Sequence, residues 1–222
     1  SQVSALNSLK SSLTTFTSAL NSLSGKGSVI AQTAAVSSAS VMTASASSAA
    51  AAGSYTFVVE KLATAQQSKF SLSELGLTAA SGAGAADNRY EIPSGSGTQM
   101  ALSVGNAGFV AVDLTNADSD GDGQLSATEV ARAVNVAMDG QVTAAVMTDA
   151  NGQQQLLINA VGTGEAGTFQ AQAVGGAAVT GQTLAIGQDA VFKLGGANGV
   201  QIKQSTNTYT GIAGLSLEFK QV

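Results

Sequence analysis

The sequence predicts an α+β protein that is mainly antiparallel β and begins with one long helix. Large apolar side chains in the first 25 residues recur at alternating spacings of three and four, the period of a helix that packs on another helix. After residue 53 this period gives way to short runs rich in β-branched and aromatic residues, separated by Gly, Asn and Ser. With 222 residues, 44% of them hydrophobic, the chain is long enough to bury a core.

The N-terminal helix is predicted to carry one narrow apolar stripe. Polar Ser, Thr and Asn fill its other faces, and Gly25 and Gly27 end the pattern. Two interpretations stay open: the helix packs on its own domain, or it is half of a coiled coil whose partner helix lies elsewhere. The narrow stripe favours the coiled coil. The stripe consists of Leu6, Leu9, Leu13, Phe16, Leu20 and Leu23.

The rest of the chain is predicted to be strands with one further helix. The first strand is the run 55–62, and a helix at 127–138 has an apolar face of Val, Ala and Met. The Asp-Ala-Asn-Gly sequence at 149–152 predicts a hairpin turn. The stretch 77–97 is rich in Gly, Ala and Ser and holds Pro93, so a domain boundary is expected near residue 76. Further strands are predicted at 90–92, 100–104, 109–114, 142–148, 154–161, 168–174, 190–194, 200–203 and 215–219.

Composition argues against several classes of function. Nine Lys and Arg are scattered among fourteen Asp and Glu, giving a net charge of −5, which disfavours nucleic-acid binding. Histidine, the commonest general base, is absent, and no nucleophile and base pair is recognisable, so an enzyme is not expected. The longest run of small residues is interrupted by serines, so no membrane span is expected. The first residues show no Sec-type signal peptide.

Three segments, in order, resemble the bacterial flagellar filament-capping family, the hook-associated protein FliD. The first is Leu-Lys-Ser-Ser-Leu at 9–13, with leucines again at 20 and 23. The second runs from the Ala-rich 43–46 through Gly-Ser-Tyr at 53–55 to Val-Val-Glu-Lys-Leu-Ala-Thr-Ala-Gln at 58–66. The third combines Gly-Gln-Asp-Ala-Val-Phe at 187–192, Asn-Thr at 207–208 and Gly-Ile-Ala-Gly-Leu-Ser-Leu at 211–217.

The resemblance implies a domain organisation. Residues 1–25 would form the helix of a coiled-coil leg domain, and 26–75 with 186–222 a middle β-rich domain. Residues 76–185 would form an outer β-rich domain with one helix, inserted in the middle one. The terminal segments that normally flank this region would be missing from the sequence.

The resemblance also implies a function and a location. Members sit as a ring-shaped homo-oligomer at the distal end of the flagellar filament, where they promote flagellin polymerisation and prevent loss of monomers. The expected partners are therefore other copies of the chain and flagellin, and host-surface molecules are a further hypothesis. The expected location is extracellular, reached by export without a Sec-type signal peptide.

Residues 118–129 match the EF-hand calcium loop at every ligand position. Calcium prefers six to eight oxygen ligands, and this loop offers carboxylates at its first, third, fifth and twelfth positions. Gly123 permits the sharp turn, and Leu125 would anchor the loop in the core. The predicted ligands are the side chains of Asp118, Asp120 and Asp122, the backbone carbonyl of Gln124, a water-mediated contact of Ser126 and the bidentate Glu129.

An alternative interpretation of the same loop needs no metal. The flank before it, 109–114, looks like a strand, whereas a true EF-hand enters from a helix. Asp and Gly are ordinary turn residues, and Ser126 with Glu129 would form a capping box for the helix that follows. Four carboxylates within twelve residues repel one another unless a cation screens them, which favours calcium. The loop is not part of the family pattern, so calcium would act locally, stabilising the outer domain.

The main alternative function is an extracellular calcium-dependent adhesin or matrix module. The β-rich, Ser- and Thr-rich, weakly charged composition and the acidic loop suit such a module, but it would not need the N-terminal stripe. Among flagellar proteins, flagellin or a hook-junction protein is also conceivable, although the Gly-Ser-Tyr and Leu-Ala-Thr-Ala elements indicate the cap.

Overall fold

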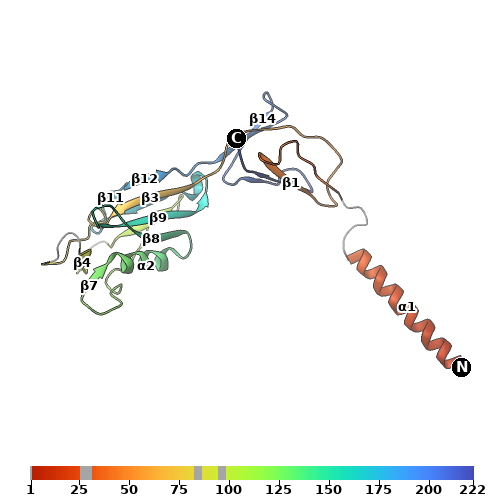
Figure 1. Cartoon of the computed structure of the whole chain (residues 1–222), viewed down its shortest axis with the longest axis horizontal. Coiled ribbons are helices and arrows are strands. Elements are labelled where there is room, and N and C mark those ends of the chain that lie inside the picture. Colours follow the sequence, from red (N-terminus) through yellow and green to blue (C-terminus); the bar gives the residue numbers. More distant parts are fainter. Residues whose placement is uncertain (1, 26–31, 83–86, 95–98) are drawn as a thin grey trace. The chain divides into compact units, whose positions relative to one another are not determined.

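The computed structural model describes residues 2–25, 32–82, 87–94 and 99–222 (Figure 1). The chain divides into two compact units, Ser1–Tyr55 with Thr208–Gln221 and Thr56–Asn207. All strand pairs within the described residues are antiparallel, which confirms the predicted fold class. No helix in the described part of the chain has the length and apolar character needed to cross a membrane.

The first unit begins with α1 (Gln2–Gly25), the predicted N-terminal helix. Its Thr14, Thr15 and Thr17 hydroxyls donate to carbonyls four residues back, at 2.8–3.0 Å. The apolar stripe is uncovered: Leu6, Leu9, Leu13, Phe16 and Leu20 are 54–68% exposed. Leu23 and Gly27 of the predicted pattern lie outside the side chains that the structure describes. Pairing of α1 with a second helix stays a prediction.

The remainder of the first unit contains a three-stranded sheet in the order β1-β16-β15. Leu217 and Phe219 on the central strand are buried, 3% and 2% exposed. Gly214 has φ +76°, and a Cβ there would lie 2.3 Å from the backbone nitrogen of Ala50, so this turn before β16 requires glycine. The strands are β1 (Met42–Ala46), β15 (Thr208–Tyr209) and β16 (Leu215–Phe219).

The second unit contains a small sheet in the order β14-β13-β2. Phe192 on the central strand is fully buried, and its ring centroid lies 6.2 Å from that of Phe57 on β2. This aromatic contact and the backbone pairing of the three strands hold the sheet together. The sequence predicts all three strands, at 55–62, 190–194 and 200–203. Their observed bounds are β2 (Phe57–Lys61), β13 (Ala190–Leu194) and β14 (Val200–Gln204).

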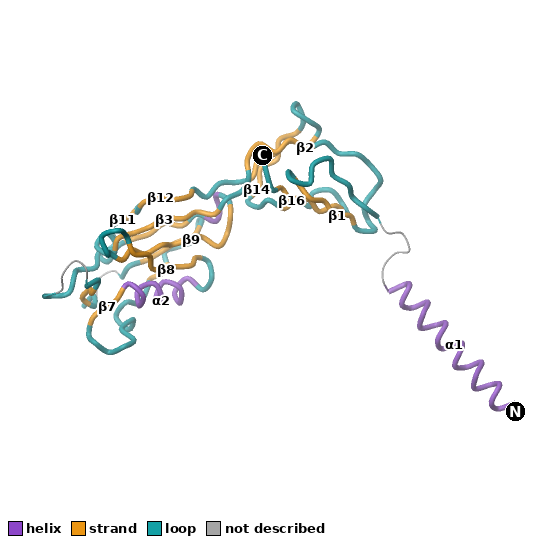
Figure 2. The backbone as a smooth tube through the Cα atoms, in the orientation of Figure 1, coloured by secondary structure: helices purple, strands orange, loops and turns teal. Residues whose placement is uncertain are grey.

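The rest of the second unit is built on a large sheet in the order β12-β3-β9-β8, with α2 (Ala127–Met138) lying along β8 (Figure 2). A second four-stranded sheet has the order β11-β10-β5-β6, and β4 pairs with β7 and, through a bridge from Tyr90, with Ala79. The large sheet comprises β3 (Ala65–Ser71), β8 (Val142–Thr148), β9 (Gln154–Thr163) and β12 (Gln182–Ala185). The others are β4 (Arg89–Glu91), β5 (Ala101–Val104), β6 (Val110–Ala111), β7 (Gln124–Ser126), β10 (Phe169–Gln172), β11 (Ala178–Val179) and the short 3-10 helix η1 (Glu165–Gly167).

One apolar core joins both four-stranded sheets and α2. Phe70 on β3 is 1% exposed, and its ring centroid lies 6.4 Å from that of Phe169 on β10. Val130, Val134 and Met138 on α2 are fully buried in the same cluster. The core therefore fixes the start of α2, and with it the loop 118–129, relative to the sheets.

The structure corrects the boundary expected near residue 76. Strand β3 was expected in the middle domain, but it pairs with β9 from Ala65↔Thr163 to Ser71↔Gln155 and with β12 on its other side. Strand β3 therefore belongs to the same sheet as β9 and β8, which lie within the residues 76–185 expected to form the outer domain. The predicted strand 109–114 shortens to β6, since only Val110 and Ala111 pair with β5.

Candidate functional site

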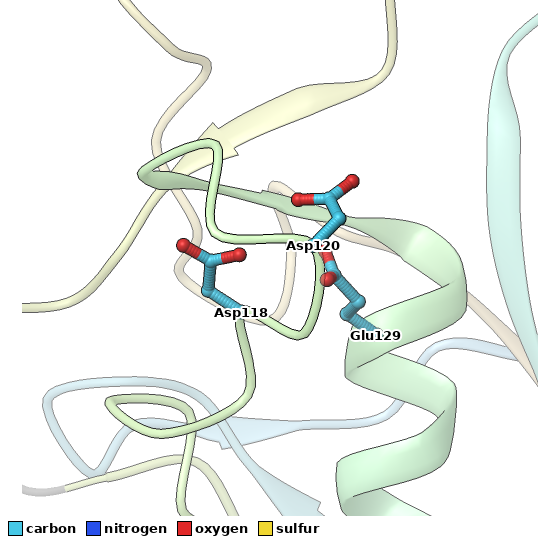
Figure 3. A group of neighbouring side chains, drawn as sticks. All are labelled: Asp118, Asp120 and Glu129. Atoms are coloured by element: carbon cyan, nitrogen blue, oxygen red, sulfur yellow. The ribbon is translucent and has the colours of Figure 1, made fainter.

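The loop 118–129 connects the core of the second unit to α2. Residues 124–126 of the loop form β7, which pairs with β4 so that Ser126 lies opposite Arg89. Helix α2 starts at Ala127. One carboxylate oxygen each of Asp118, Asp120 and Glu129 lie within 4.8 Å of one another (Figure 3). Three of the four predicted carboxylates thus converge, although they come from opposite ends of the loop.

The loop shapes itself through side-chain to backbone hydrogen bonds. Asp118 accepts from the backbone N–H of Gly121 at 2.7 Å and of Gly123 at 2.9 Å. Asp122 accepts from the N–H of Gln124 at 2.8 Å. Gly123 has φ +79°, which fits its predicted role in the sharp turn. These hydrogen bonds from backbone N–H groups to the aspartates shape the turns of the loop.

Glu129 is the buried member of the cluster, 5% exposed. Its Oε1 accepts from the N–H (2.6 Å) and hydroxyl (2.9 Å) of Ser119, and its Oε2 accepts from the N–H and hydroxyl of Ser126, both at 2.9 Å. Burial alone would raise the pKa of Glu129, but these hydrogen bonds outweigh it and lower the pKa to about 2. The capping box of the alternative interpretation is therefore present, with Ser126 as the N-cap of α2.

Asp122 lies outside the converging group. The Nη1 of Arg89 on β4 lies 2.5 Å from an oxygen of Asp122 and 3.9 Å from one of Asp120. This guanidinium supplies part of the positive charge that the sequence analysis assigned to a cation. Arg89 is 33 residues away from Asp122, and only the β4–β7 pairing brings the two together, so no sequence signal marks it.

The remaining predicted positions agree with the loop as a whole. Leu125 is fully buried, as expected of the anchor, and Gln124 lies on β7 opposite Glu91. Ser119, which the sequence analysis did not select, is the second partner of Glu129. An oxygen-rich group of three carboxylates suits a hard divalent cation such as Ca²⁺. A bidentate contact from Glu129 would compete with the bonds that Ser119 and Ser126 donate to its two oxygens.

Comparisons with known proteins give consistent matches. Residues 1–66 match the family model FliD_N, described as "Flagellar hook-associated protein 2 N-terminus". A lateral flagellar hook-associated protein 2 of Vibrio parahaemolyticus is 29% identical over 195 residues, which cover 82% of this chain and 40% of that protein. The chain thus spans less than half the length of that curated relative.

Solved structures share the fold. The D1-D2-D3 domains of FliD from Escherichia coli align with a TM-score of 0.67 and 23% identity, over 99% of this chain and 60% of that one. The D2-D3 domains of the same protein align with a TM-score of 0.58 and 20% identity, over 84% and 91% of the two chains. FliD (HAP2) from Pseudomonas aeruginosa aligns with a TM-score of 0.56 and 19% identity, over 82% and 80%.

Proposed function

We propose that the chain belongs to the FliD family of flagellar hook-associated proteins and is part of the structural cap at the distal end of a bacterial flagellar filament. In this proposal several copies form a ring that promotes flagellin polymerisation and prevents loss of monomers. The protein acts as a scaffold, without catalytic chemistry. The observation that carries the proposal is the family match at 1–66, continued by a fold shared over nearly the whole chain.

The exposed stripe of α1 supports an assembly role. Leu9, Leu13 and Phe16 are 63–65% exposed in the single chain, and an apolar stripe at alternating spacings of three and four suits a second helix. We propose that α1 forms a coiled coil of the leg domain with a helix from outside residues 1–222. The stripe would then be covered in the assembled protein.

Deleting the gene tests the cap function. We expect loss of swimming and a rise of monomeric flagellin in the medium, because flagellin that arrives at an uncapped tip is not retained. The full-length gene should restore both. Normal filaments in the deletion strain would contradict the cap function.

A matched pair of variants connects this result to α1. The full-length gene with Leu9→Ser and Leu13→Ser should fail to restore swimming, because both changes remove apolar area from the stripe. The same gene with Ser8→Ala and Ser12→Ala changes the neighbouring positions and should restore it. Equal swimming with the two leucine replacements and with the two serine replacements would contradict the coiled-coil proposal but not the cap proposal.

The alternative adhesin or matrix function has no support from the relatives named above, which are all flagellar. Location at the filament tip outside the cell follows from the cap proposal. Contact of the part of the second unit around α2 with host-surface molecules stays a prediction.

For the loop 118–129 we propose a local calcium site that stabilises the second unit. The support is the ligand pattern of the sequence together with the convergence of Asp118, Asp120 and Glu129. Asp122 would become a further ligand by giving up its ion pair with Arg89 and binding the cation instead. In this proposal calcium adds to the hydrogen bonds that Asp118 and Glu129 already accept within the loop.

Calorimetric titration with Ca²⁺ tests this site. The unmodified chain should show one binding site, and Glu129→Gln should lose it, because an amide is a far weaker calcium ligand than a carboxylate. The control is Glu91→Gln on the adjacent β4, which removes an exposed carboxylate outside the converging group and should keep the site. An unmodified chain that gives no heat would contradict calcium binding.

A further inference from the structure

Two of the three sequence segments that resemble the FliD family meet at one place within the second unit. They contribute Leu62 to Thr64, Gln188, Asp189 and Asn207, which lie between the small sheet β14-β13-β2 and the large sheet β12-β3-β9-β8. We call this place the junction and define it as residues 62–64, 163–165, 186–189 and 203–207. The chain passes between the two sheets only twice, at 62–64 and at 186–189.

These two passages are hydrogen-bonded to each other. The N–H of Thr64 donates to the carbonyl of Gln188 at 3.0 Å, and the N–H of Gln188 donates back to Thr64 at 3.2 Å. The side-chain amide of Gln188 donates to the carbonyl of Leu62 at 3.1 Å. The hydroxyl of Thr64 donates to the carbonyl of Ile186 at 2.7 Å. The passages therefore form a short two-stranded crossing instead of two separate linkers.

Asn207 closes the outer side of this crossing. Its side-chain oxygen accepts from the N–H of Ala63 at 2.7 Å, and its side-chain nitrogen donates to the carbonyl of the same residue at 3.0 Å. One amide thus satisfies both backbone groups of Ala63, as a neighbouring strand would. Ala63 is 5% exposed, so water does not replace these two bonds without opening the junction.

The end of β9, which belongs to the large sheet, is also hydrogen-bonded to the junction. The hydroxyl of Thr163 donates to the carbonyl of Ser205 at 2.6 Å, and the N–H of Glu165 donates to Asp189 at 2.7 Å. Lys203 on β14 forms ion pairs with Glu165 at 2.7 Å and with Asp189 at 3.5 Å. The bond of Thr163 with Ser205 and the ion pair of Lys203 with Glu165 therefore connect the two sheets through groups outside the two passages.

We propose that the junction is a lock that makes the two sheets of the second unit one rigid body. In this lock Asn207 holds the passage at 62–64 in place. Two extended passages alone would form a hinge, because a few residues could absorb a change in backbone angles. The bonds of Thr64, Gln188 and Asn207 must break together before that hinge opens. The proposal concerns the mechanics of this unit and holds whether or not the chain caps a filament.

Distances between two spin labels in the full chain test the lock. The chain has no cysteine, so Val136→Cys on α2 and Val200→Cys on β14, 77% and 71% exposed, create unique labelling sites on the two sides of the junction. We expect one narrow distance distribution in the otherwise unmodified chain. Asn207→Ala should broaden it about twofold and speed amide exchange at Ala63 about tenfold, because the side-chain acceptor of that N–H is lost.

The control is Asn116→Ala, which removes an exposed amide bonded to Asp113 in the same unit, away from the junction, and should leave both readouts unchanged. A broad distribution in the unmodified chain, or an unchanged one in Asn207→Ala, overturns the lock. If Asn207→Ala does not fold, Gln188→Ala decides, since it removes the side-chain bond that Gln188 donates to the carbonyl of Leu62. Broadening then supports the lock, and an unchanged width overturns it.

Discussion

Replacing Phe70 by alanine is expected to lower the free energy of unfolding of the second unit by about 4 kcal/mol. Phe70 is 1% exposed and packs against Phe169 from the other four-stranded sheet, with a centroid distance of 6.4 Å. Its ring also lies against the turn before β12, where a Cβ on Gly181 would come within 2.5 Å of it. Removing the ring leaves a cavity between three elements that cannot all move in to fill it. Urea unfolding followed by circular dichroism measures the loss.

The matched control is Phe109→Ala. Phe109 precedes β6 in the same unit but is 44% exposed, so its loss should change the free energy of unfolding by less than about 1 kcal/mol. Equal effects of the two replacements would show that the cluster around Phe70 is not the core of this unit.

Acidification is expected to remove the stabilisation that Glu129 provides. The pKa of Glu129 is about 2 in the folded protein, below the ordinary value of 4.5, so its carboxylate favours the folded state at every pH above 4.5. This contribution falls as the pH drops from 4.5 towards 2, and it amounts to about 3 kcal/mol. The cause is the four hydrogen bonds from Ser119 and Ser126, which a protonated carboxyl accepts less well.

Glu129→Gln isolates this effect from other acid groups. Hydrogen bonds also lower the pKa of Asp113 and Asp149, so the unmodified chain loses stability in acid for more than one reason. Unfolding free energies in calcium-free buffer should differ between the unmodified chain and Glu129→Gln at pH 7, and the difference should shrink below pH 4.5. A constant difference down to pH 2 would mean that the carboxylate charge of Glu129 does not stabilise the fold.

The sequence predicted those elements whose signals are local. Helix α2 has the predicted bounds because Ser126 and Glu129 form a capping box and the apolar period begins directly after it. The turn between β8 and β9 follows from Asp-Ala-Asn-Gly at 149–152, where Gly152 has φ +77°. Both features depend on residues within a few positions of each other.

Two features that depend on distant partners were missed. Strand β3 contains Gln66, Gln67, Ser68 and Lys69, which do not look like a strand at the centre of a sheet, yet Ser68 is fully buried between β9 and β12. Its place is set by a ladder to residues about 90 positions later in the chain. The ion pair of Arg89 with Asp122 has the same origin, since it follows from the β4–β7 pairing and from no local pattern. The sequence therefore predicted the acidic loop but not the positive charge of Arg89 that pairs with it.

The pairing of Thr64 with Gln188 has a consequence for how this chain tolerates change. Everything between these two residues leaves the small sheet and returns to it at adjacent backbone positions. Such a segment can vary in length and sequence, or be exchanged for another segment. Neither change alters the distance between the ends of the flanking strands β2 and β13. Large differences between proteins that share the small sheet are therefore expected to concentrate between residues 64 and 188.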